Sequence, residues 1–246
     1  MDNHKDGVLP LYGQIKRWIV GQIQSGIWKP GHMLPSEKQL QQQFGVSRTT
    51  VRQAIAELQA EGFVEKHQGR GTLVAKPKFE WQLRKLRGFT ADVIAKGHVP
   101  RSIVLSSEVV LASDQVCSLL KLEKGSHVFK LVRLRFIDDD PVQLHTLHMP
   151  LDVAEKIGYD ELEFSTCSVY AELKRVNVEP WEGEEILEVG LASDLESTLF
   201  GIPKGSPLII TRSVVVDRNQ QPIEYTIVKI RGDRYRHSVR LKMEDG

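Results

Sequence analysis

The sequence predicts an α+β protein built from two domains. Three segments with helical spacing and a short hairpin pattern fill the first part of the chain, and the second part contains an internal repeat of a short helix with paired strands. The charge also changes sign: residues 1–78 carry 11 Lys and Arg against 6 Asp and Glu, whereas residues 79–246 carry 22 against 26. We therefore expect a helical domain over residues 1–75, a linker over 76–88, and an antiparallel sheet with helices over 89–246.

The composition is that of a soluble globular protein, with 41% apolar and 26% charged residues in a chain of 246. The basic N-terminal part, on an otherwise acidic chain, indicates that only this part meets a polyanion. Cys117 and Cys167 are the two cysteines and form no CxxC motif, which favours a reducing cytoplasm. The first residues lack the apolar core of a signal peptide, and no segment is long enough to span a bilayer, so we expect no membrane partner.

The N-terminal part begins with two predicted helices. Residues 11–25 have apolar positions on one face and precede a glycine. A second helix follows Ser36, which is a good N-cap, and Gln39 completes a capping box with it. Gly45 ends this helix, and the third begins two residues later at Ser47. Two helices joined by such a short turn form the helix-turn-helix pattern.

The third helix combines a buried stripe with a polar N-terminal end. Its stripe consists of Val51, Ala54, Ile55 and Leu58. Off the stripe, its first two turns carry Arg48, Thr49, Arg52 and Gln53. Such an end suits a DNA major groove, where Arg reads guanine edges and the helix N-terminus faces phosphate. Taken alone, the segment also fits a solvated, capped surface helix.

A small hairpin follows this helix. Residues 63–66 and 72–74 alternate like strands, around a basic, glycine-rich tip. Gly69 lets the backbone approach a surface closely, and Arg70 suits a narrow minor groove. By itself the tip reads equally as a flexible turn. Three helices followed by this hairpin, or wing, together indicate DNA binding.

Four short motifs occur along this part of the chain: Pro10-Leu11-Tyr12, Leu34-Pro35-Ser36-Glu37, the segment from Phe44 to Arg52, and Gly69-Arg70-Gly71-Thr72. Together they resemble the motifs of the GntR superfamily of bacterial transcription regulators. The resemblance implies a winged helix-turn-helix domain that binds a double-stranded DNA operator. It implies that DNA is contacted by Lys38, Arg48, Thr49, Thr50, Arg52 and Gly69. The family often has Arg where this chain has Lys38, and Lys lacks the planar fork, so the base preference there is less defined.

The C-terminal part contains an internal repeat with a spacing of about 80 residues. Ala112-Ser113-Asp114 recurs at residues 192–194, and residues 122–126 recur at 202–206. Each copy continues into a strand, an acidic or amide-rich turn, a proline and another strand. Two copies predict a pseudo-symmetric domain in which one antiparallel sheet is packed against helices.

Residues 89–241 resemble the effector-binding UTRA domain of the HutC-type subfamily, which has a chorismate-lyase-like fold. The matching segments are Phe89-Thr90, Arg133-Leu134-Arg135, His148-Met149-Pro150, Ser168-Val169-Tyr170 and residues 231–235. Within the subfamily, the chain is most similar to the regulators of N-acetylglucosamine use. The resemblance implies that this domain binds a small-molecule effector.

Two arginines stand out on a predicted strand of this domain. Arg133 and Arg135 are two residues apart and share a face with Phe129, Leu131 and Ile137. A buried cation is costly without a partner, so either a carboxylate or an anionic ligand should meet these two. The sequence leaves both alternatives open, a structural salt bridge and an anion site.

Hydroxyl groups are expected close to this pair. Ser168 and Tyr170 follow a helix start predicted around Ser165, which is a suitable place for phosphate. In the amino-sugar regulators, the residues matching Arg133, Arg135, Ser168 and Tyr170 hold the sugar phosphate. The resemblance therefore implies a phosphorylated effector.

The other end of the ligand is less constrained. Glu224 matches an acidic residue that binds sugar hydroxyls in those regulators, whereas His145 replaces a glutamate and Ile230 replaces a tyrosine. These two replacements indicate a different head group. His145 reads equally as a ligand contact and as a histidine satisfied within the fold. His145 and His148 are three apart on a strand and thus on opposite faces, which argues against a shared metal.

These features predict a ligand-responsive, DNA-binding transcription regulator that acts as a homodimeric repressor without a cofactor. Phe89 and Thr90 lie just past the linker, so ligand contacts there would move the DNA-binding domains. An activator, or a regulator without an effector, would use the same DNA chemistry. A lyase-like enzyme is disfavoured, because no catalytic triad, metal-ligand spacing or placed carboxylate pair is recognisable.

Overall fold

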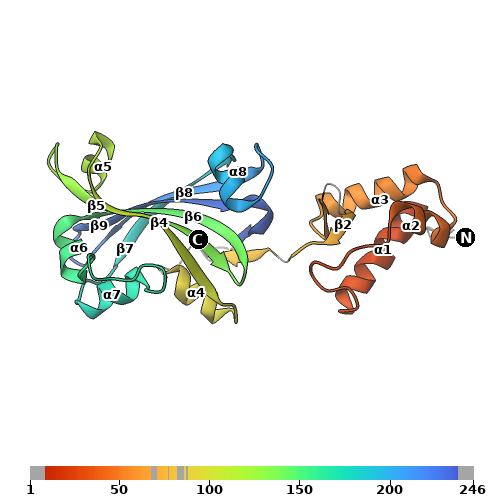
Figure 1. Ribbon diagram of the computed structural model, residues 1–246, viewed down its shortest axis with the longest axis horizontal. Helices are drawn as coiled ribbons and strands as arrows, with labels where there is room; N and C mark the ends of the chain where they lie inside the picture. Colours follow the sequence, from red (N-terminus) through yellow and green to blue (C-terminus); the bar gives the residue numbers. More distant parts are fainter. Residues whose placement is uncertain (1–8, 68–70, 77, 82–85, 87, 238–246) are drawn as a thin grey trace, which may run out of the picture. The chain divides into compact units, whose positions relative to one another are not determined.

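The computed structural model divides the chain into two compact units, residues 1–78 and residues 79–246 (Figure 1). It describes residues 9–67, 71–76, 78–81, 86 and 88–237. The charge change in the sequence falls at the same boundary. Each unit has its own hydrophobic core, and each is described here by itself.

The N-terminal unit consists of three helices and a two-stranded hairpin, as the sequence predicts. The elements are α1 (Leu11–Gln24), α2 (Glu37–Phe44), α3 (Arg48–Ala60), β1 (Val64–His67) and β2 (Gly71–Val74). Strands β1 and β2 pair antiparallel. The apolar faces of the three helices meet in one core that includes Ile15, Ile19, Leu40, Val51, Ala54, Ile55 and Leu58. The predicted stripe of α3 is therefore confirmed as its buried side.

Capping residues set the angle between α2 and α3. Ser36 and Gln39 form the predicted capping box at the start of α2. Gly45 ends the helix with φ +64°, a left-handed conformation that glycine adopts without strain. The hydroxyl of Ser47 accepts a hydrogen bond from the backbone N–H of Thr50 at 3.2 Å, so α3 begins after a short turn. This turn orients the exposed N-terminal end of α3.

The C-terminal unit is built on one six-stranded antiparallel sheet in the order β4-β5-β6-β9-β8-β7. Its strands are β4 (Pro100–Leu111), β5 (His127–Ile137), β6 (Asp140–Pro150), β7 (Glu182–Leu191), β8 (Pro207–Val216) and β9 (Pro222–Arg231). Helices α4 (Phe89–Ala95), α6 (Leu151–Ile157) and α7 (Val169–Arg175) lie on one face, and α5 (Asp114–Leu119) and α8 (Asp194–Phe200) lie on the other (Figure 1). The α+β architecture with an antiparallel sheet is confirmed.

The internal repeat appears in the structure as two matching halves. Strands β4-β5-β6 and β7-β8-β9 each form three neighbouring strands, joined through β6 and β9. Ser113 caps α5 and Ser193 caps α8. Lys124 pairs with Asp114 at 2.7 Å in the first half, and Lys204 pairs with Asp194 at 2.8 Å in the second. The repeated residues therefore make the same helix cap and the same ion pair in both halves.

Within the linker expected over residues 76–88, residues 77, 82–85 and 87 lie outside the described residues. Of the rest, Phe79–Trp81 form a short strand, β3. It pairs in parallel with β10 (Tyr235–His237), which follows the short 3₁₀ turn Gly232–Arg234. Local sequence does not predict this strand, because the backbone partner of β3 comes from the far end of the described chain.

Candidate functional site

The DNA-facing surface predicted for the N-terminal unit lies on α2 and α3. The predicted contact residues that the structure describes are Lys38, Arg48, Thr49, Thr50 and Arg52. All are exposed except Thr50, which is partly buried and whose hydroxyl lies 2.9 Å from that of Ser47. The helix thus presents its cations and a threonine to solvent while its apolar stripe is buried. Gly69 and Arg70 lie outside the described residues.

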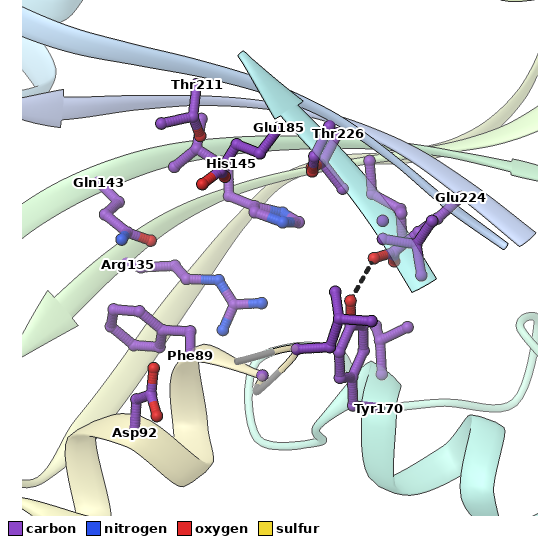
Figure 2. A pocket seen from close by; sticks show the side chains of 18 of the residues that line it. Phe89, Asp92, Arg135, Gln143, His145, Tyr170, Glu185, Thr211, Glu224 and Thr226 are labelled. Carbon is purple, nitrogen blue, oxygen red and sulfur yellow. Dashed lines mark hydrogen bonds between the residues drawn. The ribbon is translucent and has the colours of Figure 1, made fainter. Parts of the chain in front are cut away.

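In the C-terminal unit, a cavity of about 630 Å³ lies between the sheet and helices α4 and α7. All nine residues predicted to bind the effector line it. They are Phe89, Thr90, Arg133, Arg135, His145, Ser168, Tyr170, Glu224 and Ile230. These residues come from two helix starts and three strands that are far apart in sequence. Figure 2 shows Arg135 on one side of this cavity and the hydrogen-bonded pair of Tyr170 and Glu224 on the other.

The two arginines are buried without a carboxylate partner. Arg133 is 1% exposed and Arg135 is 5% exposed. Arg133 donates from Nη1 to the backbone carbonyls of Phe164 at 3.3 Å and Cys167 at 3.4 Å. The guanidinium carbon of Arg135 lies 4.8 Å from the ring centre of Phe89. Among the described residues, neither forms an ion pair, and the Nε atom of each is buried without a hydrogen-bond partner. The predicted salt-bridge alternative is therefore not found in this part of the chain.

Burial disfavours the charged form of these two arginines and so lowers their pKa values. Burial lowers the pKa of Arg133 to about 10, and burial together with Arg133 lowers the pKa of Arg135. The pKa of His145 is also lowered, first by burial and then by Arg135 and Arg133, so its imidazole is neutral at pH 7. Its Nδ1 atom is buried without a partner among the described residues. This side of the cavity therefore concentrates positive charge and unused hydrogen-bonding capacity.

The opposite side carries a buried acid. Glu224 is 4% exposed, and the hydroxyl of Tyr170 donates to its Oε1 at 2.6 Å (Figure 2). Burial raises the pKa of Glu224 to about 7, although the Tyr170 hydrogen bond and the two arginines lower it. Burial and Glu224 raise the pKa of Tyr170. The folded protein therefore retains the Glu224 proton to a higher pH than a solvated carboxyl group would.

Strand register brings further polar side chains into the cavity. Arg133 pairs with His145, and Arg135 pairs with Gln143, across β5 and β6. Thr211, Ser213 and Thr226 also line the cavity, with a hydrogen bond of 2.7 Å between the hydroxyls of Ser213 and Thr226. Sequence reasoning missed Gln143, Thr211 and Thr226 (Figure 2). Alternation could have found two of them, because Gln143 shares a strand face with His145, and Thr226 with Glu224.

The position of Ser168 differs in detail from the expectation. The helix predicted to start around Ser165 begins at Val169, and residues 164–166 form a turn. Ser168 is the N-cap residue, but its side chain makes no capping hydrogen bond. The turn follows Phe164, whose side chain is buried in the sheet-side core and whose carbonyl accepts from Arg133. These contacts hold the segment non-helical and leave the Ser168 hydroxyl on the cavity wall.

Two histidines of β6 and the Arg231-Gly232-Asp233 segment occupy separate places in the C-terminal unit. His145 and His148 lie on opposite faces of the sheet: His145 lines the large cavity, and His148 lines a second cavity of about 310 Å³. Arg231 is 6% exposed and pairs with Asp140 at 3.0 Å and with Asp233 at 2.7 Å. The Arg231-Gly232-Asp233 segment is therefore a structural turn.

Comparison with known proteins identifies a family model for each of the two units. Residues 11–74 match the model described as bacterial regulatory proteins, gntR family, and residues 95–236 match the UTRA domain. The chain is 33% identical over 236 residues to the HTH-type transcriptional repressor NagR of Bacillus subtilis, covering 96% of each protein. The chain belongs to the GntR family. Its helix-turn-helix unit followed by a UTRA domain is the arrangement of the HutC-type subfamily.

Other GntR-family relatives agree in sequence and in fold. The histidine utilization repressor of Pseudomonas aeruginosa is 34% identical over 203 residues, which cover 82% of this chain and 80% of that protein. The crystal structure of PhnF from Mycobacterium smegmatis superposes with a TM-score of 0.65 at 26% identity, covering 95% of this chain and all of that one. NagR and the histidine utilization repressor are both named as repressors, which supports a DNA-binding regulator rather than an enzyme. None of the described helices combines the length and apolar character needed to cross a membrane.

Proposed function

We propose that this GntR-family regulator is a cytoplasmic, homodimeric repressor whose affinity for DNA is changed by a phosphorylated small molecule. The observation that carries the proposal is the pair of buried guanidiniums, Arg133 and Arg135, facing a cavity of about 630 Å³ without an ion-pair partner among the described residues. An anionic ligand would supply the missing negative charge. Arginine is the side chain best suited to bind a phosphate through several parallel hydrogen bonds.

Phosphate is favoured over a simple carboxylate by the groups around the pair. The hydroxyl of Ser168 is free of capping, and the hydroxyl of Tyr170 lies on the same wall. The Tyr170 hydroxyl already donates to Glu224, but two guanidiniums and the Ser168 hydroxyl still provide more donors than one carboxylate can use, whereas a phosphate accepts on three oxygens. The resemblance to the regulators of N-acetylglucosamine use supports an amino-sugar phosphate, but His145 and Ile230 change the wall around the head group.

The DNA chemistry would reside in the N-terminal unit. The proposal assigns base and phosphate contacts to Lys38, Arg48, Thr49, Thr50 and Arg52, with Gly69 and Arg70 of the wing at the minor groove. A two-fold dimer would place its recognition helices in half-sites roughly 34–36 Å apart on a near-palindromic operator. The names of NagR and of the histidine utilization repressor support repression as the sign of regulation.

Ligand binding would reach the DNA-binding unit through the start of α4. Phe89 and Thr90 line the cavity, and Phe89 lies against the guanidinium of Arg135. Both residues follow the segment that connects the units, so an anion at Arg135 would act on the connection directly. Substituting Phe89 or Thr90 should alter the ligand response more than the affinity for DNA. Unchanged ligand response in both variants would contradict this route.

The test is a thermal-shift screen of the full chain with inorganic phosphate, sugar phosphates and the matching unphosphorylated sugars. A ligand of the folded state raises the melting temperature with concentration. We expect shifts only with phosphorylated compounds, and we expect Arg133→Ala and Arg135→Ala to abolish them. The same variants should retain salt-dependent binding to duplex DNA. Equal loss of DNA binding, or shifts with unphosphorylated sugars, would contradict the proposal.

A further inference from the structure

An ion pair joins the two helices of the helix-turn-helix. Arg48, the first residue of α3, donates from Nε to Oε2 of Glu37, the first residue of α2, at 3.1 Å. The side chain of Arg48 is 71% exposed, whereas that of Glu37 is 27% exposed. The carboxylate of Glu37 is therefore partly buried, whereas most of the Arg48 side chain is exposed to solvent.

The position of Glu37 is itself held by its helix. Ser36 and Gln39 close the capping box around the start of α2, so the backbone at Glu37 has a defined place. The carbonyl of Glu37 accepts from the side-chain amide of Gln41 at 3.2 Å. A carboxylate on such a fixed backbone can restrict the rotamers of a long side chain that pairs with it.

Arg48 uses its Nε atom for the contact with Glu37, and this choice decides which N–H donors remain for DNA. A guanidinium has five N–H donors in a planar fork, and Nε supplies one of them. With Nε engaged by Glu37, both terminal nitrogens of Arg48 keep their donors as far as the described residues are concerned. Two parallel N–H groups are what a bidentate contact to O6 and N7 of guanine requires. The ion pair therefore orients Arg48 without consuming its base-reading edge.

We propose that Glu37 is a positioning residue that holds Arg48 for reading a guanine. This inference deepens the proposed function and rests on the proposed entry of α3 into the major groove. Glu37 raises the ratio of specific to non-specific affinity, because its charge repels the phosphates of every duplex whereas its contact with Arg48 helps only at the correct base. Preorganising Arg48 reduces the rotamer entropy lost when it meets the correct base.

A structural role for Glu37 makes different predictions. As an acid in the first turn of α2, Glu37 also interacts favourably with the helix dipole. In that role, loss of the carboxylate would lower the stability of the unit and weaken binding to every duplex equally. Glu37→Asp separates the two roles, because aspartate keeps the charge at the helix start but its side chain is too short to keep the same contact with Arg48.

The experiment begins with a duplex enriched from a random library by the wild-type chain. Affinities for this duplex and for a scrambled one are then measured over a range of salt concentrations. The variants are Glu37→Gln, Glu37→Asp, Arg48→Ala and the double variant Glu37→Gln/Arg48→Ala. Glu61→Gln is the charge-matched control, because Glu61 is an exposed acid of the same unit and its partner Lys16 keeps a second pair with Glu57.

We expect Glu37→Gln and Glu37→Asp to reduce the ratio of specific to non-specific affinity by at least about fivefold, within the range for one bidentate contact. In Glu37→Gln the non-specific affinity should rise, and Glu61→Gln should keep the wild-type ratio. In the Arg48→Ala background, Glu37→Gln should cause no further loss of the ratio.

A wild-type ratio in Glu37→Asp, or an additive loss in the double variant, would overturn the inference. If Glu37→Gln does not fold, as judged by its melting temperature, the same comparison of affinity ratios is made with Glu37→Asp and with the double variant Glu37→Asp/Arg48→Ala. Failure of the wild-type chain to enrich any duplex would overturn the proposed function itself, and is recognised by the absence of a specific duplex at the outset.

Discussion

Replacing Glu224 by glutamine should stabilise the ligand-free C-terminal unit at alkaline pH. Glutamine keeps the shape of the side chain and an oxygen that can accept from the Tyr170 hydroxyl, which lies 2.6 Å from Oε1 in the wild-type protein. It removes the requirement to ionise a group that is 4% exposed. The change therefore isolates the cost of a buried negative charge.

The sign and size of the effect follow from the raised pKa of Glu224. Burial raises this pKa from 4.5 to about 7, a difference that includes the opposing influence of Tyr170 and the two arginines. The folded state thus holds its proton over a range where the unfolded state has lost it. Stability from this group is complete below pH 4.5 and is lost as the pH rises through about 7. At about 1.36 kcal/mol per unit, the loss approaches roughly 3 kcal/mol by pH 8.

The assay is calorimetric melting of the full chain, without ligand, at several values between roughly pH 5 and pH 8. For a unit of this size, the variant should melt roughly 6–12 °C above the wild type at pH 8 and nearly with it at pH 5. Glu161→Gln, an exposed acid of the same unit, controls for the generic loss of a carboxylate. Parallel pH profiles for wild type and Glu224→Gln would refute the reasoning, as would a variant that is less stable at pH 8.

Three further changes test other parts of the structure. Arg135→Met should stabilise the ligand-free unit by about 1–3 kcal/mol and should abolish thermal shifts with phosphate compounds, because it removes a buried guanidinium that Arg133 repels and that forms no ion pair among the described residues; lower stability would contradict this. Ser47→Ala should cost the N-terminal unit about 1 kcal/mol in urea unfolding through loss of the cap on Thr50, and an unchanged midpoint would argue against that cap. Gly232→Ala should destabilise the C-terminal unit by about 1–3 kcal/mol, since its Cβ would lie 2.9 Å from the carbonyl oxygen of Pro207; an unchanged melting temperature would show that the turn can shift.

Much of the candidate site could be predicted from sequence because it follows local periodicity and family motifs. Arg133 and Arg135 share a strand face by alternation alone, and both line the cavity. Thr211 could not be placed in the same way, because it lies in a strand rich in apolar, β-branched residues. Its position in the cavity depends on the register with Val228, which only the assembled sheet supplies.

The limits of local pattern are also clear at two segments. The helix expected around Ser165 is replaced by a turn, because the carbonyls of Phe164 and Cys167 accept from the buried Arg133. The strand Phe79–Trp81 has its partner near residue 235. In both cases, the contact that determines the conformation comes from a distant part of the chain, so the local sequence does not predict it.

By itself, the sequence determined the helix-turn-helix with its caps, the twofold repeat and the family of the protein, because these depend on spacings within a few residues or on repeated motifs. Only the tertiary structure decided that nine separated residues share one cavity and that the two arginines lack a carboxylate partner within the described part of the chain. The same holds for the shift in the Glu224 pKa to about 7. Burial and charge pairing depend on which strands become neighbours, and that is settled when the sheet assembles in the order β4-β5-β6-β9-β8-β7.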